Sequence, residues 1–439
     1  MSITKVGVKA GSIAFAGVTI LSGAAQAQTS PLASPQPLLP YVFSADRVSV
    51  NQRARPEYQS EGLNIGSLRV LPSVSAGVSY TDNVYGSENE NASDGFVLVQ
   101  PTLRLFQGGE TADSNALSVN LTGQVRRYFE EKAANESAVA GTGEGTLALG
   151  GGTTLTGGVG VRRTYERWDS GSVPAAALAP IRYDQLTSFV RLRTGGSRIR
   201  GTVAADMSRQ SYGDAEVSAT GDRFDQSYRD RTVLRGTGRI EYSLSGAASG
   251  YVEGSYSDIN YDRNFLIGTI PNRDGQEASI LAGGIIDAGK LRGGIGAGYT
   301  RRMFDSAVFR DFGSFAVNAD LTYFASGLTT YTLSAYRRVE ESGAIDTTAL
   351  LSTGVSLDVD HELYRNVILS ARGAVEKSSF RGLDRDDTVF AINGRARYLV
   401  NRRLEVNAEA LYIKRTSSGT VIGPEFHRFQ FGLNVVGRF

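Results

Sequence analysis

The chain has 439 residues, a formal net charge of +1 and no cysteine. This balanced charge gives no bulk attraction to nucleic acid, and the lack of cysteine excludes disulfides and thiolate metal sites. After residues 1–27, no run approaches the ~18 consecutive apolar residues that a membrane-spanning helix needs. Hydrophobic residues make up 41% of the chain, which fits a membrane wall only where every second side chain meets lipid.

The N-terminus predicts export. Lys5 and Lys9 precede a short apolar stretch at 10–21, and Ala25-Gln26-Ala27 fits an A-x-A cleavage site. We therefore expect residues 1–27 to be a signal peptide cleaved near Ala27. Residues 28–65 follow as a Pro-rich periplasmic leader, for which three interpretations stay open: a linker without fixed structure, a partner-binding arm, or a plug of the lumen.

From residue 66 to 439 the chain alternates strand-like runs with short and long connections. The short ones lie near residues 150, 195, 246, 289, 327 and 401, and all but the Asn401-Arg402 turn contain Gly, whereas the long ones are polar. Strict alternation of this kind predicts an all-β, up-and-down antiparallel transmembrane barrel of about 18 strands. The short turns and both termini should be periplasmic, and the loops near Asn89, Ala176, Thr220 and Arg273 should lie outside the cell.

Alternating faces support the barrel. In the last strand Phe429, Phe431, Leu433 and Val435 share one face and polar residues occupy the other. The ninth strand, YVEGSYSDINY, does not alternate cleanly, so a bulge is expected there. Phe439 ends the chain as a terminal aromatic residue, and we expect it to act as the assembly signal for the barrel-assembly machinery.

Several of these features together resemble the beta-barrel porin-2 family of outer-membrane proteins. They are the signal, the Pro-rich leader, the opening strand VSAGVSYTDNVY, the next strand FVLVQPTLRL and the terminal Phe. The resemblance implies an outer-membrane barrel and an association with exopolysaccharide. It brings no site residues with it.

No enzymatic constellation is found. His361 lies beside a predicted turn between Asp360 and Glu362, and strand geometry keeps these three from converging on a metal. His427 is expected at the outer rim, where a hydrolase could use it, but no partner serine can be assigned. We expect no catalytic, cofactor or metal site.

Charged residues on the two faces supply the candidate functional residues. Inward arginines outnumber the acids assigned inward, and clusters on incoming strands predict a basic stripe in the lumen that favours anions. The stripe comprises Arg191, Arg193, Arg231, Arg235, Arg239, Arg395 and Arg397. An equally simple interpretation is that arginines and acids pair into a rigid network. The opposite parity predicts an outer rim of lipid-facing cations comprising Arg127, Arg163, Arg209, Arg301, Arg337, Lys377 and Lys414.

The sequence therefore predicts a passive outer-membrane channel for anionic solutes or sugars, linked by resemblance to exopolysaccharide export. The alternative is a non-conducting adaptor barrel of a polysaccharide secretion apparatus. The expected partners are outer-membrane lipid and lipopolysaccharide, the barrel-assembly machinery, and a polysaccharide or anionic solute. Nucleic acid is not expected as a partner.

Overall fold

The computed structural model describes residues 39–41, 43, 48–88, 92–108, 114–166, 177–217 and 222–439. The predicted signal peptide at 1–27 lies outside these residues, as do the loop positions Asn89, Ala176 and Thr220. Among the described residues, no helix is both long and apolar enough to cross a membrane. The three helical turns, η1 (Pro56–Tyr58), η2 (Lys132–Ala134) and η3 (Ser227–Arg229), are short 3-10 segments.

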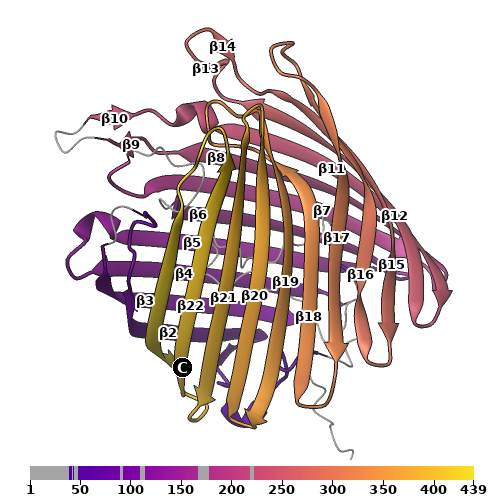
Figure 1. Ribbon diagram of the computed structural model, residues 1–439. Coiled ribbons are helices and arrows are strands. Elements are labelled where there is room, and N and C mark those ends of the chain that lie inside the picture. Colours follow the sequence, from indigo (N-terminus) through magenta and orange to yellow (C-terminus); the bar gives the residue numbers. More distant parts are fainter. Residues whose placement is uncertain are drawn as a thin grey trace, which may run out of the picture.

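Eighteen long strands form one closed antiparallel barrel, as the sequence predicted (Figure 1). The first nine are β2 (Leu68–Thr81), β3 (Asp94–Gly108), β4 (Ala116–Tyr128), β5 (Glu136–Gly150), β6 (Thr153–Glu166), β7 (Ile181–Gly195), β8 (Ile199–Tyr212), β11 (Arg231–Ser245) and β12 (Ala248–Tyr261). The other nine are β15 (Gly275–Ala288), β16 (Leu291–Phe304), β17 (Phe312–Phe324), β18 (Thr329–Glu340), β19 (Ala349–Tyr364), β20 (Val367–Arg381), β21 (Arg385–Leu399), β22 (Leu404–Gly419) and β23 (Phe426–Arg438).

Each long strand pairs with the next, and β2 pairs with β23 to close the wall. Closure leaves no free edge, so every strand backbone finds a partner without water. Five minor strands lie outside this ring of eighteen: β1 (Leu63–Ile65), β9 (Ala215–Glu216), β10 (Arg223–Phe224), β13 (Phe265–Ile267) and β14 (Ile270–Pro271). Of these, β1 extends the wall by pairing with β2, while β9 pairs with β10 and β13 with β14 in the long loops.

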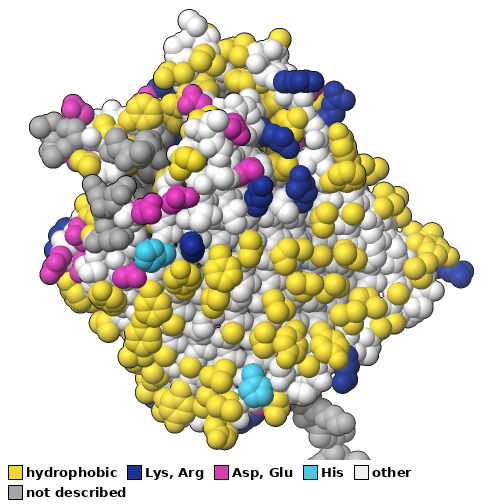
Figure 2. Space-filling model, viewed as in Figure 1, with side chains coloured by type: hydrophobic (Ala, Val, Ile, Leu, Met, Phe, Trp, Pro, Cys, Tyr) yellow, Lys and Arg dark blue, Asp and Glu magenta, His cyan; other side chains and the backbone are white. Residues whose placement is uncertain are grey.

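The outer face is apolar. Val203, Ile240, Ile280 and Phe315 are each at least 60% exposed, as expected for side chains that would meet lipid. In Figure 2 apolar side chains are spread over the visible wall, and many of the charged ones gather toward the long-loop end. The last strand behaves as predicted, because Phe429, Phe431, Leu433 and Val435 all face outward.

Two expectations about the wall are wrong. The alternation of connections is not strict, since β20 and β21 are joined at the long-loop end by only residues 382–384, while β3 and β4 are joined at the other end by 109–115. The ninth strand, β12, carries no bulge between residues 251 and 261, where it pairs in continuous register with β11 and β15. Its inner face holds Tyr251, Ile259 and Tyr261, all buried, so the expected polar–apolar alternation is missing although the pairing is regular.

Candidate functional site

The candidate site is the lumen, whose lining follows from the strand registers, because paired residues in neighbouring strands point to the same side. All stripe residues predicted to face inward do so by this criterion. The register also places inward acids that the sequence pattern did not assign. These are Asp94, Glu136, Glu144, Glu166, Glu253, Glu277, Asp287, Glu340, Glu362 and Asp387. The excess of inward arginine is therefore much smaller than predicted.

Many inward arginines are neutralised by cross-strand acids. Arg126 lies 3.1 Å from Glu136, and Arg372 lies 3.1 Å from Asp358. Arg415 contacts Asp387, which also accepts from Arg385. Such pairs hold long side chains against the wall and remove much of their field from the lumen.

The seven stripe arginines have different surroundings. Arg239 lies 2.6 Å from Glu253, and Arg395 lies 3.2 Å from Glu409, so both are ion-paired. Arg235 donates to the Ser257 hydroxyl, and Arg231 donates to the Arg229 carbonyl. The structure thus does not bring the seven together as one uniform stripe.

The remaining stripe members lie on β7 and β21. Arg191 lies 5.1 Å from the ring centre of Phe189, and Arg193 lies two residues closer to the short-turn end. Arg397 lies among charged groups that include Asp360 and Arg55. Within the described part of the chain, neither Arg191 nor Arg397 has a carboxylate oxygen at ion-pair distance, 4.0 Å or less.

The leader lies inside the barrel at the short-turn end. Arg239 donates to the carbonyl oxygens of Leu39 and Pro40, at 2.7 and 3.4 Å. The Tyr41 ring lies over Gly294, where a Cβ atom would come within 2.4 Å of it, and its hydroxyl is 3.2 Å from that of Tyr251. Leu39 is 1% exposed, so this contact is a packed one.

A second group of contacts holds residues 48–60. Val50 is completely buried against Ile368 and Leu399. Arg55 lies 2.7 Å from the buried carboxylate of Glu362. Ser60 donates to the carbonyl oxygen of Phe439, which ties the leader to the C-terminus. Among the three interpretations of the leader, these contacts fit the lumen plug, and we call the described residues within 39–58 the strap.

The described residues of the strap contact one side of the lumen. Among the described residues, the wall contacts of 39–58 go to β11, β12, β15, β16, β18, β19, β20, β21 and β23. No hydrogen bond or ring contact in that set reaches β3–β8. The sequence hinted at this docking only through the glycines Gly294, Gly296 and Gly298 on the inner face of β16.

At the opposite end, long loops pack into one body. Arg302 is fully buried, lies 3.2 Å from Glu341 and donates to the Arg273 carbonyl at 2.8 Å. Arg273, also fully buried, donates to the carbonyls of Ala344 and Thr347. Tyr228 donates to the Gly343 carbonyl and Asn272 donates to the Tyr228 carbonyl, so the connections 213–230, 262–274 and 341–348 are joined. In the sequence these connections are marked only by their polarity.

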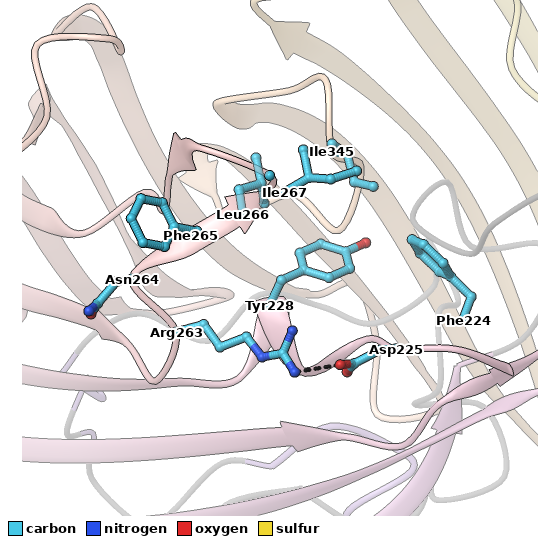
Figure 3. Close-up of a pocket in the computed structure, with 10 residues that line it drawn as sticks. Phe224, Asp225, Tyr228, Arg263, Asn264, Phe265, Leu266, Ile267 and Ile345 are labelled. Carbon is cyan, nitrogen blue, oxygen red and sulfur yellow. Dashed lines mark hydrogen bonds and ion pairs between the residues drawn. The ribbon is translucent and has the colours of Figure 1, made fainter.

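These loops line an open pocket of about 520 Å³ (Figure 3). Its walls include Phe224, Tyr228, Leu266 and Ile345, and an ion pair between Arg263 and Asp225 closes one side. Hydrogen bonds from Ser227, followed by the charge of Arg263, hold the pKa of Asp225 below its usual value. Burial raises the pKa of Tyr228.

The predicted outer-rim cations lie on the outer face of the barrel. Most are exposed and paired: Arg163 with Asp184, Arg209 with Asp262, Arg301 with Asp311, and Lys377 with Asp386. Arg127 donates to the Glu136 carbonyl and Ser137, and Arg337 donates to Ser314 and Thr353. Lys414 pairs across strands with His427 and Phe390.

The histidines form no site with acids in the described residues. His361 lies 2.9 Å from the Thr329 hydroxyl through Nδ1. Within the described ranges, no group of three or more His, Asp or Glu side chains could hold a metal ion.

A closed barrel with an apolar outer face and a charged inner face defines the class: an outer-membrane β-barrel. The chain belongs to the family described as "Putative beta-barrel porin 2", whose model matches residues 55–439. The resemblance seen in the sequence is thereby confirmed, and with it an outer-membrane location and a porin-type barrel.

Solved structures with a similar fold include outer-membrane proteins. OpdL of Pseudomonas aeruginosa is 13% identical, with a TM-score of 0.43, over 85% of this chain and 100% of that one. OccK3 (OpdO) of the same organism is 12% identical, with a TM-score of 0.41, over 84% and 95%. The copper transporter OprC is 10% identical, with a TM-score of 0.43, over 88% and 82%. No curated protein sequence matches the chain.

Proposed function

We propose that this barrel is a passive outer-membrane channel for anionic solutes or sugars and that it carries no enzymatic activity. The observation that best supports this proposal is Arg104, whose side chain is exposed although it faces the lumen of the barrel. An exposed inward guanidinium is available to a passing anion, and interior charge sets the selectivity of a barrel. The family's association with exopolysaccharide makes carboxylated sugars the substrate class to try first.

A flux assay in liposomes tests the channel. Folded protein, checked by its heat-dependent mobility in gels, should admit small carboxylated sugars and exclude large dextrans. The permeability should depend on solute size, with no turnover of lipid or sugar. Absence of flux from well-folded protein would contradict the channel.

A second function is favoured by one observation, the strap at the short-turn mouth. Because Val50 and Arg55 are buried there, the barrel could instead be a non-conducting adaptor of a polysaccharide secretion apparatus. In that case the leader would present its N-terminal part to a periplasmic partner. The same liposomes decide between the two functions, since an adaptor gives no flux even when the leader is loosened by substitution.

We also propose that the outer rim contacts phosphates of lipopolysaccharide and that Phe439 is read by the barrel-assembly machinery. Lys414 supports the first proposal, because no carboxylate of the described residues lies at ion-pair distance from it. Loss of lipopolysaccharide from Lys414→Gln in native mass spectrometry would support it, with Arg163→Gln as the ion-paired control. Phe439→Ser should lower the yield of assembled barrel, and an unchanged yield would contradict that role.

A further inference from the structure

The short-turn half of the lumen is lined unequally. On β2–β6 the inward residues are mostly small: Ser73, Ser75, Gly77, Thr102, Ser118, Asn120, Thr142, Thr146, Ala148, Thr154, Thr156, Gly158 and Gly160. On β11–β21 small inward residues such as Gly294 and Ser334 also occur, but there the strap is packed over the inner face. Small side chains leave lumen space beside β2–β6, and this space lies next to the region that the strap does not contact.

Arg104 lies on β3, among these small inward residues. Its cross-strand neighbours are Leu71 on β2 and Asn120 on β4, both uncharged. Among the described residues, no carboxylate oxygen lies within ion-pair distance of it, and the charged group whose field acts on it is another arginine, Arg438. Arg438 is itself ion-paired with Glu405, so it is the charge of Arg104 that stays available to an anion in the lumen.

Arg191 borders the same space from β7. Its guanidinium lies over Phe189, and the Phe189 ring lies flat on Gly158, where a Cβ atom would come within 2.5 Å of it. The glycine thus positions the ring, and the ring positions the arginine. The Arg191 Nε atom is buried without a hydrogen-bond partner among the described residues.

Arginines beneath the strap lie closer to acids, whereas Glu144 and Asp206 act on Arg191 only from beyond ion-pair distance. Arg239 is 3% exposed, lies between the rings of Tyr41 and Tyr251, and has the carboxylate of Glu253 beside it. Arg395 is balanced by Glu409. Their charges are balanced by acids of the wall, and Arg239 also holds the strap, so these arginines attract a passing anion only weakly.

We propose that solutes cross the short-turn half of the lumen along the β2–β7 wall and that Arg104 and Arg191 determine the preference for anions there, while the strap closes off the other side. This inference rests on the proposed channel function and narrows it to one path and two residues. The predicted stripe of seven arginines around the whole wall is thereby replaced by a charged lane on one side of the lumen, which consists of Arg104 and Arg191.

Reversal potentials in planar bilayers under a salt gradient test the two residues. The double variant Arg104→Gln/Arg191→Gln should shift the reversal potential toward zero, because the lane loses two inward guanidinium groups that have no carboxylate at ion-pair distance among the described residues. The matched control is Arg395→Gln, whose charge is already balanced by Glu409 and which lies on the strap side. A control shift as large as that of the double variant, or an unchanged double variant, would overturn the inference.

Engineered thiols test the path itself, because the chain has no native cysteine. Ala148→Cys lies on the inner face of β5, and Ser356→Cys lies on that of β19. An anionic methanethiosulfonate should reduce the conductance of the first variant and leave the second unchanged. Equal block of both would overturn the one-sided path. Conductance absent from every folded variant, including one with a loosened leader, would instead contradict the channel function.

Discussion

At the scale of single residues, glycine decides where large side chains can lie in this lumen. Gly294 leaves room for Tyr41 of the leader, and Gly158 does the same for Phe189. Neither glycine has a positive φ, so the backbone conformation itself would tolerate a side chain. At Gly294 the three atoms nearest to an added Cβ atom all belong to the Tyr41 ring, whereas at Gly158 the Gly143 carbonyl oxygen also lies within 3.0 Å. A substitution at Gly294 therefore reports on docking and not on strand formation.

Gly294→Val should release the first part of the leader. Overpacking costs typically about 1–3 kcal/mol, which corresponds to about 5- to 150-fold in the exposed population. Labelling of a Leu39→Cys thiol should accelerate by that factor. Gly236→Val on β11 is the control, since a Cβ atom there would meet nothing within 4 Å. Unchanged labelling in Gly294→Val would mean that the ring does not hold the leader.

Asp225 gives a pH-dependent prediction at the same scale. Its pKa is lowered first by hydrogen bonds from Ser227 and then by Arg263. A carboxyl group with a depressed pKa stabilises the folded loop above its ordinary pKa near 3.8, and this contribution is lost as the pH falls through the depressed value. Carbon-13 NMR titration should find a pKa below 3.8 that rises more in Ser227→Ala than in Arg263→Gln. The reverse order would contradict the assignment of causes.

At the scale of elements, the connections define the two ends of the barrel. Lys290 lies in the tight turn between β15 and β16, whereas Val308 lies in the connection 305–311 at the other end and is 66% exposed. In intact cells, Val308→Cys should react with an impermeant thiol reagent and Lys290→Cys should react only after the outer membrane is opened. Equal reaction of both in intact cells would invert or abolish the topology.

Individual strands also show which features of the barrel could be predicted from the sequence. Strands that face lipid on one side and an open lumen on the other alternate clearly, and β23 was predicted correctly for that reason. β12 was misjudged because Tyr251 and Tyr261 face inward but are covered, by the strap and by Glu341 of a long loop. A covered inner face becomes apolar and loses the period of two. Glu253 was missed among the lumen acids for the same reason, since it lies on β12 itself.

At the scale of the whole molecule, the strap and the barrel wall act as one lining. Strap residues neutralise or cover Arg239, Arg292 and Glu362, and the terminal Phe439 is tied to Ser60. No local pattern in residues 28–65 could show this, because the docking surface is assembled from strands up to 380 residues further along. From the sequence alone, the leader could be described only as polar and Pro-rich.

Loosening the strap should therefore change conductance and selectivity together. Tyr41→Ser/Phe43→Ser/Val50→Ser removes three apolar side chains, at a cost to leader docking of about 2–5 kcal/mol for each large one, and leaves the wall sequence intact. The mouth should widen, so single-channel conductance should rise. The strap side would then expose Asp358, Asp360 and Glu362 to solutes, so anion preference should fall at the same time.

Glu57→Gln/Glu61→Gln, which alters only exposed leader pairs, should leave both quantities unchanged. A rise in conductance with undiminished anion preference would mean that the strap side contributes no acid field to the path, and no rise at all would mean that the strap does not restrict the mouth.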